Sequence, residues 1–173
     1  MAPLITLLAA TLLLRAAGAA GIRPLRSWHT SLRGGLAAMF TLTGTAHFNG
    51  MRNDLIAMVP PALPHPELLV TLTGVLELLA AAGLLHRRTA PWAAGGLTLL
   101  LVAMFPANVH AALAGLMVNG EPATALLPRT LMQLVFVAAT IVVVLPYTRA
   151  LPRRRSAATR TALPARIPES LHE

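Results

Sequence analysis

Long apolar stretches, separated by short polar or basic segments, dominate the chain. Five can be marked, and three of them contain no Asp, Glu, Lys or Arg. A helix that crosses a bilayer core needs about 20 predominantly apolar residues, and a lipid-exposed strand or loop would leave backbone groups unpaired. We therefore predict five membrane-spanning helices, in residues 3–21, 34–51, 68–85, within 89–120, and 130–148.

Shorter signals mark the connections between these stretches. Residues 53–59 predict a short interfacial helix, flanked by the loop-forming pairs Asn49-Gly50 and Pro60-Pro61. Pro91 suits the first turn of the fourth helix, where the N–H that proline lacks has no intrahelical partner. Asn119-Gly120 predicts where that helix ends.

Composition supports the membrane class and bounds the fold. The chain is 55% hydrophobic and only 12% charged, whereas soluble domains carry roughly 25% charged residues. Its 173 residues allow one compact bundle and no second domain of ordinary size. We predict an all-α transmembrane helical bundle, with a four-helix core at residues 33–147 and an additional N-terminal helix at residues 1–21. Residues 148–173, rich in Arg and Pro, are predicted to be a disordered cytoplasmic tail.

The first stretch allows two interpretations. Its small residues at positions 16–20 are typical of a signal-peptide cleavage site. However, no basic segment precedes the stretch, and Arg15 lies inside it. Cleavage would also place the basic residues 22–33 outside, against the positive-inside rule. We favour an uncleaved helix with its N-terminus outside.

The basic residues set the expected orientation. All 14 are Arg, and the formal net charge is +8. With the N-terminus outside, eleven Arg fall in cytoplasmic segments and two, Arg52 and Arg129, in outer segments, while Arg15 lies within the first helix. This asymmetry predicts a multi-pass protein of an inner (plasma) membrane with a cytoplasmic C-terminus. Because the Arg residues flank apolar stretches, their pattern indicates a bilayer partner and no nucleic acid.

Glu77 is the only formal charge in the third stretch. A charged side chain at the centre of a spanning helix costs about 2.5–3.5 kcal/mol on insertion scales, so such residues usually face the bundle interior. Thr73 and Ala81 share its helical face and leave room for close packing. Two interpretations stay open. Glu77 is either a proton acceptor or ligand anchor, or a protonated residue that donates one interhelical hydrogen bond.

The fourth stretch holds further polar candidates. Pro106 in a helix interior removes a backbone hydrogen bond and is expected to kink the helix. Asn108 is expected at the depth of Glu77, which makes a hydrogen bond between the two plausible. His110 is two residues on, hence about 200° away around a regular helix, so we expect Asn108, not His110, to face inward. Gln133 in the fifth stretch is expected to add an interhelical hydrogen bond.

His47, Arg52 and Asp54 lie at the predicted outer boundary. Arg52 and Asp54 either pair, bind polar groups at the mouth of a site, or form an ordinary solvated loop pair. A lone His at an interface is more often a capping residue than a metal ligand, and the chain has no Cys. We therefore predict no metal site.

A short repeat precedes two of these residues. Thr41-Leu42-Thr43-Gly44 recurs as Thr71-Leu72-Thr73-Gly74, and three residues after each Gly comes His47 or Glu77. The two predicted helices run in opposite directions, so the repeat does not indicate a simple stacked array.

The order of several motifs resembles the DoxX family of small bacterial membrane proteins. The resemblance covers about residues 33–145 and lies in these segments: residues 39–48, Arg52, Asp54, residues 58–61, residues 73–78, and residues 105–108. It implies a four-helix membrane core and a link to redox systems, since the family is named for a subunit of a thiosulfate:quinone oxidoreductase. The family motif positions in this chain are His47, Arg52, Asp54, Glu77, Pro106 and Asn108.

Two hypotheses follow for the function. The first is a membrane subunit of a quinone-linked or oxidative-stress redox system, with redox-enzyme subunits as partners. No cofactor is evident from the sequence, and a quinone is the candidate that this hypothesis names. In it, Glu77 would act on a quinone head group with help from Asn108 and His47. The second is a non-catalytic scaffold or assembly factor, in which the polar groups only fix helix packing. A carrier is a third and weaker hypothesis, because five helices are few for one. The sequence assigns no catalytic residue.

Overall fold

The computed structural model describes residues 1–118 and 120–148. The described residues are predominantly helical, which confirms the all-α prediction. Apart from Thr148, the predicted tail lies outside the described residues. The elements, in chain order, are α1 (Ala2–Ala19), the 3-10 helix η1 (Arg23–Arg26), α2 (Trp28–Ala46), α3 (Arg52–Met58), α4 (Pro66–Leu85), α5 (Ala90–Leu113), β1 (Met117–Val118), β2 (Glu121–Pro122) and α6 (Leu126–Thr148).

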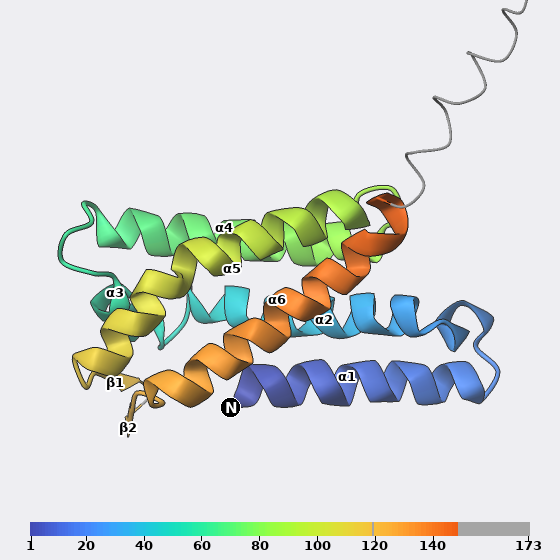
Figure 1. Cartoon of the computed structure of the whole chain (residues 1–173), viewed down its shortest axis with the longest axis horizontal. Helices are drawn as coiled ribbons and strands as arrows, with labels where there is room; N and C mark the ends of the chain where they lie inside the picture. The colour runs from blue at the N-terminus through green and yellow to red at the C-terminus, as the bar shows by residue number, and fades with distance from the viewer. Residues whose placement is uncertain (119, 149–173) are drawn as a thin grey trace, which may run out of the picture.

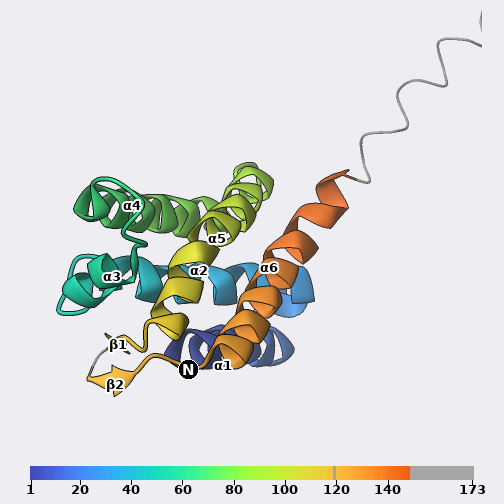
Figure 2. The same cartoon turned by 60° about the vertical axis from the view of Figure 1, so that its left-hand side comes forward.

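The five long helices form one bundle, in which α1, α4 and α6 pack against α2, and α5 packs against α4 and α6 (Figures 1 and 2). α1 runs antiparallel to α2 on one side, and α4 runs antiparallel to α2 on another side. α6 crosses α2 obliquely. Two ends can be named. The α3 end carries the N-terminus, α3 and the β1–β2 hairpin, and the η1 end carries η1, the α4–α5 loop and the end of α6. The buried apolar core contains Leu36 and Phe40 of α2, Leu84 of α4, Leu97 of α5 and Val143 of α6.

Within the described residues, four helices are long and apolar enough to cross a membrane: Ala2–Ala19, Pro66–Leu85, Ala90–Leu113 and Leu126–Tyr147. The chain is therefore a multi-pass membrane protein. The predicted second span differs from this set. It forms a helix, but α2 begins at Trp28 and ends at Ala46, where residues 34–51 were expected, and it does not reach the same apolarity.

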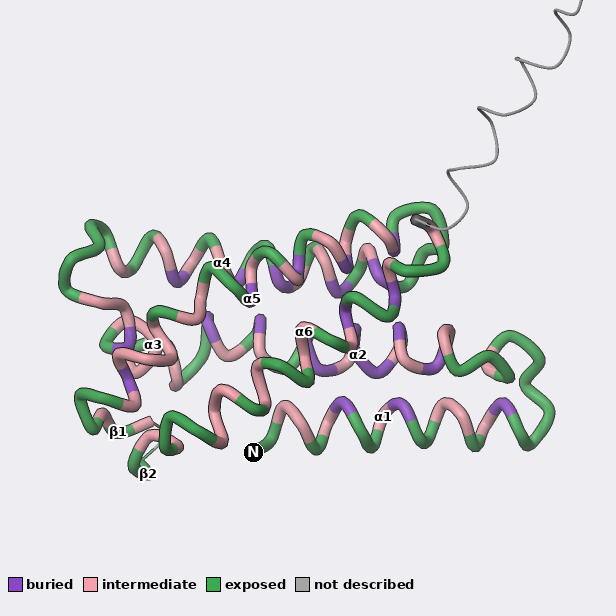
Figure 3. Tube along the Cα trace, viewed as in Figure 1, coloured by how far each residue is buried: buried purple, intermediate pink, exposed green. Residues whose placement is uncertain are grey.

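The polar first turns of α2 are the reason, and their side chains have partners inside the bundle. His29 Nε2 lies 3.0 Å from the carbonyl oxygen of Val143, and Ser31 donates to the Leu25 carbonyl at 3.0 Å. The buried Arg33 donates to the carbonyls of Leu84 and Leu85, at 2.8 and 3.0 Å, where α4 ends. A basic side chain there satisfies carbonyls that have no helical partner. α2 is polar because neighbouring helices cover it, as its many buried positions show (Figure 3).

The η1 end also has the features of a membrane boundary. Trp28 begins α2 and is 59% exposed, and Trp92 lies in the first turn of α5 and is 82% exposed. Trp is enriched where lipid meets water. The guanidinium of Arg15, near the end of α1, lies 5.5 Å from the centroid of the Trp28 ring. This cation–π contact stabilises the Arg15 charge, although Arg15 Nε is buried without a hydrogen-bond partner.

The connections follow the sequence signals with one correction. The predicted interfacial helix is α3, and Pro91 lies in the first turn of α5 as expected. The predicted end of α5 at Asn119-Gly120 is wrong, because the helix ends at Leu113. Gly115 then adopts a left-handed backbone (φ +60°), which terminates the helix. The residues assigned to its last turn instead enter the β1–β2 hairpin.

Candidate functional site

A cavity of about 390 Å³ opens among the helices toward the α3 end of the bundle. It lies within the size range of small-molecule sites, roughly 300–1,000 Å³. We call it the polar cavity, because four of the predicted site residues line it. Its lining includes Met39, Phe40, Thr43, His47, Leu55, Met58, Glu77, Leu101, Met104, Asn108, Arg129, Gln133 and Phe136.

Glu77 lies in the middle of α4 and is 4% exposed. It is eleven residues beyond Pro66, which places it about 16 Å along the helix at 1.5 Å per residue. Its Oε2 accepts a hydrogen bond of 2.5 Å from the Thr43 hydroxyl of α2. Ala81, one turn further on, is buried as the expected small-residue face requires. The carboxyl is therefore held against α2 and borders the cavity.

Asn108 faces α6, where two side chains bind it. Its Oδ1 accepts a hydrogen bond of 2.9 Å from Arg129 Nη1, and its Nδ2 donates to Gln133 Oε1 at 3.4 Å. Gln133 in turn donates through Nε2 to the carbonyl of Leu101 in α5. Asn108, Arg129 and Gln133 thus form a polar network that joins α5 to α6 on the cavity wall.

The expected hydrogen bond between Glu77 and Asn108 is not formed, although both line the cavity. The earlier end of α5 explains the difference. Asn108 is only five residues from Leu113, about 7.5 Å, whereas Glu77 lies about 16 Å from the start of α4. The two residues therefore lie at different depths, and each binds a partner at its own level.

Pro106 lies inside α5, which bends along its course (Figures 1 and 2). Proline cannot donate to the carbonyl four residues earlier, at Val102. The Gln133 amide binds the adjacent Leu101 carbonyl, so a side chain of α6 holds α5 at the segment that the proline weakens. Pro106 is thus a kink residue whose neighbourhood the polar network supports.

His47 follows the last residue of α2 and is 3% exposed. Its Nδ1 lies 2.9 Å from the carbonyl oxygen of Thr43, the residue whose hydroxyl binds Glu77. Arg52 donates to the His47 carbonyl at 3.1 Å and to the Thr71 hydroxyl at 2.9 Å. His47 is therefore a buried residue that fastens the end of α2, as expected for a capping histidine, and it also lines the cavity.

Asp54 and His110 are placed outside the polar cavity. Asp54 lies in the first turn of α3, where a negative charge favours the helix dipole. The Nδ1 of His110 lies 3.0 Å from the Met58 carbonyl oxygen and joins α5 to the end of α3. Asn108 and His110 face different neighbours, which confirms the expectation from their spacing.

The short repeat lies where α2 and α4 cross. A Cβ atom built on Gly44 would lie 2.9 Å from the Leu78 side chain and 3.3 Å from Glu77 Cβ. One built on Gly74 would lie 2.5 Å from His47 Cβ and 2.9 Å from the Phe48 ring. Each glycine thus faces the residues three and four positions after the other glycine. The two antiparallel copies pack reciprocally, about a local two-fold axis.

Two functional candidates were missed from the sequence. Arg129 was assigned to an outer loop, yet it lies inside α6, four residues before Gln133 and on the same face. The four-residue spacing between Arg129 and Gln133 is the sequence signal that could have placed Arg129 beside Gln133. Thr43 was named only as part of the short repeat, and nothing in one sequence indicates that its hydroxyl binds Glu77.

The cavity combines two chemical walls. The α2–α4 wall presents a carboxyl beside a hydroxyl, and the α5–α6 wall presents a guanidinium beside two amides. The rest of the lining is largely apolar. Within residues 1–118 and 120–148, no group of three or more His, Cys, Asp or Glu side chains could hold a metal ion. This arrangement suits an uncharged or weakly polar ligand that accepts and donates hydrogen bonds.

A protein family described as "Domain of unknown function (DUF8561)" matches residues 36–144. No curated protein and no solved structure matches the chain. The matched range excludes α1 and contains every residue of the polar cavity except Ala2 and Pro3, which lie at the start of α1.

Proposed function

We propose that this chain, which belongs to the family of unknown function that matches residues 36–144, is a membrane subunit of a quinone-linked or oxidative-stress redox system. Its polar cavity would bind a quinone head group. One observation carries the proposal: the Glu77 carboxyl and the Asn108–Arg129 pair line a single cavity that is otherwise largely apolar. The resemblance to the DoxX family supports the redox link.

The two walls match the chemistry of a quinone. Quinone oxygens accept hydrogen bonds, and Arg129 and Asn108 carry N–H donors on one wall. Reduction of a quinone to a quinol takes up two electrons and two protons. Redox-enzyme partner subunits would supply the electrons, and the Glu77 carboxyl on the other wall is a group that exchanges protons. His47 borders the same space and assists. A buried carboxyl and guanidinium in a spanning bundle are costly, and such residues usually mark functional sites.

We further propose that the protein lies in a bacterial inner membrane with its N-terminus outside and its C-terminus in the cytoplasm. The Arg asymmetry supports this orientation. Arg23, Arg26, Arg87 and Arg88 all belong to segments of the η1 end, whereas Arg52 lies near the α3 end. The polar cavity would then lie in the outer half of the bundle.

Binding of decylubiquinone to the detergent-purified protein tests the proposal. Glu77→Gln keeps the size of the side chain but removes its titratable group, and we expect affinity to fall at least tenfold. Glu67→Gln is the matched control, because Glu67 is exposed in the first turn of α4 and its side chain lies outside the cavity. Absent binding to the wild type, or equal binding by both variants, would refute the proposal.

A second candidate function is a non-catalytic scaffold or assembly factor. It is favoured by the fact that Glu77, Asn108 and Gln133 each bind a neighbouring helix. In that case Glu77→Gln lowers the unfolding temperature, no quinone binds, and capture of partner subunits from native membrane stays at the wild-type level.

A further inference from the structure

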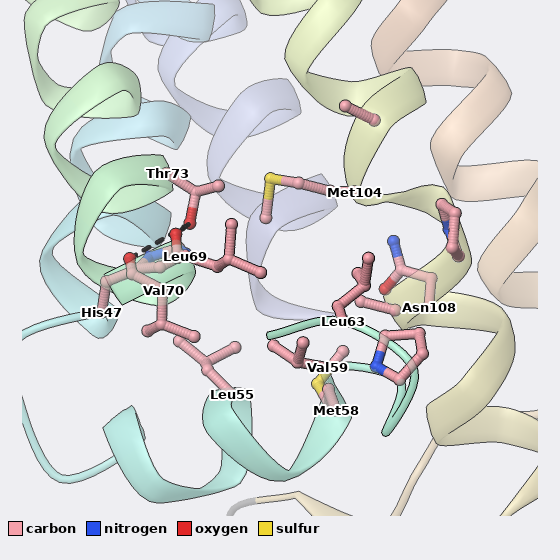
Figure 4. A pocket seen from close by; sticks show the side chains of 14 residues that line it. His47, Leu55, Met58, Val59, Leu63, Leu69, Val70, Thr73, Met104 and Asn108 are labelled. Carbon is pink, nitrogen blue, oxygen red and sulfur yellow. Dashed lines mark hydrogen bonds between the residues drawn. The ribbon is translucent and has the colours of Figure 1, made fainter. Parts of the chain in front are cut away.

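A second, smaller pocket of about 200 Å³ lies between α3, the loop that follows it, α4 and α5 (Figure 4). Its lining is apolar except for three residues: His47 and Thr73 on one side and Asn108 on the other. The Thr73 hydroxyl already donates to carbonyls of its own helix. We call this space the α3 pocket. Its surface suits a hydrocarbon and not a polar head group.

The α3 pocket adjoins the polar cavity. His47, Leu55, Met58, Met104 and Asn108 line both spaces. The α3 pocket alone is smaller than the range of roughly 300–1,000 Å³ for small-molecule sites, so it fits part of a ligand better than a whole one. The shared residues make it an apolar extension of the polar cavity.

Hydrogen bonds fix α3 over this pocket at both ends. At its first residue, Arg52 donates to the carbonyl of His47 and the hydroxyl of Thr71. At its last residue, the Met58 carbonyl oxygen lies 3.0 Å from His110 Nδ1. A seven-residue helix has little stability of its own. These side chains therefore keep the roof of the pocket in place.

We propose that the α3 pocket holds the apolar chain of an amphipathic ligand whose hydrogen-bonding head lies in the polar cavity. The inference rests on the proposed function and extends it. It assigns the ligand class as a head group with a single flexible hydrocarbon chain. A chain in the pocket would contribute through burial of apolar surface, while Asn108 and His47 would contact the ligand at the junction of head and chain.

Photolabelling tests the inference on the wild-type protein. Two probes carry the same decyl chain with a terminal diazirine, one on a benzoquinone and one on a benzene ring. We expect the quinone probe to label residues 59–70, and the benzene probe to label them far less. Equal labelling of residues 59–70 by both probes supports binding of a hydrocarbon chain in the α3 pocket but refutes the quinone function. Labelling confined to lipid-facing residues such as Leu79 and Leu99 overturns the inference.

Two variants test separately how the ligand's hydrocarbon chain and its head group contribute to binding. Ala107→Phe fills the pocket from α5, and we expect the affinity for decylubiquinone to fall at least tenfold while that for tailless ubiquinone-0 stays within twofold. Ala112→Phe on the same helix, outside both cavities, is the control. An equal loss for both quinones overturns the inference. If Ala107→Phe does not fold, the photolabelling of the wild type decides.

Discussion

Gly74→Ala is the sharpest test of the α2–α4 crossing. The added Cβ would lie 2.5 Å from His47 Cβ and 2.9 Å from both His47 Cγ and the Phe48 ring. His47 Cβ is attached directly to the backbone, so the clash requires the helices to shift. Overpacking of this kind costs about 1–3 kcal/mol, and three contacts below 3.0 Å place this site near the upper limit.

Alanine also stabilises a helix relative to glycine, by about 1 kcal/mol. The net expectation for Gly74→Ala is therefore a loss of about 2 kcal/mol. For a chain of this size, 1 kcal/mol shifts the unfolding midpoint by about 2–4 °C, so the midpoint should fall by about 4–8 °C. Circular dichroism of the detergent-purified protein measures this shift.

Two glycines provide graded controls. A Cβ on Gly96 in α5 would meet nothing within 4 Å, so Gly96→Ala should be neutral or slightly stabilising. Gly44→Ala should fall between the two, because its closest neighbour is the flexible end of Leu78. If Gly74→Ala unfolds at the same temperature as Gly96→Ala, the reciprocal packing inferred for this crossing is wrong.

Three further predictions concern the charges. Arg33→Ala leaves the last carbonyls of α4 unpaired inside the bundle and should cost about 3 kcal/mol in unfolding experiments; an unchanged midpoint would show that water reaches them. Arg129→Met should weaken decylubiquinone binding at least tenfold with a smaller loss of stability, and intact binding would remove Arg129 from the site. Because the chain has no Cys, a single introduced cysteine reports on which side of the membrane its segment lies. Glu121→Cys should react with an impermeant maleimide added outside the cell, whereas Arg87→Cys should react only after lysis. The reverse result would show that the orientation is inverted.

Helix positions could be read from the sequence because apolarity and length are local properties. The start of α2 could not, because four of the six residues 28–33 are polar and the partners of His29, Ser31 and Arg33 lie far along the chain or outside the helix. Arg33 illustrates this, since its role depends on where α4 ends. The end of α5 was misplaced for a related reason. Residues 114–118 are apolar enough to continue a helix, and the left-handed Gly115 interrupts it.

The sequence predicted which residues line the site better than it predicted which of them hydrogen-bond to each other. Glu77, Asn108 and Gln133 were expected to face other helices, His47 was expected at the outer boundary, and all four line the polar cavity. Which partner each side chain binds depends on how deep the two residues lie in the bundle. An error in the predicted end of one helix, here α5, is enough to change the expected depth and therefore the expected partner. Arg129 shows what the positive-inside rule misses. The rule counts an Arg near a helix end as a loop residue and takes no account of the helix face on which the side chain lies.

The low apolarity of α2 has a consequence for how the chain enters the membrane. Among the described helices, four can partition into lipid by their own composition, whereas α2 begins with polar turns and carries Arg33 near the η1 end. The carbonyls that Arg33 binds belong to the end of α4, which is synthesised after α2. We therefore expect neighbouring helices, more than its own apolarity, to hold α2 in the membrane.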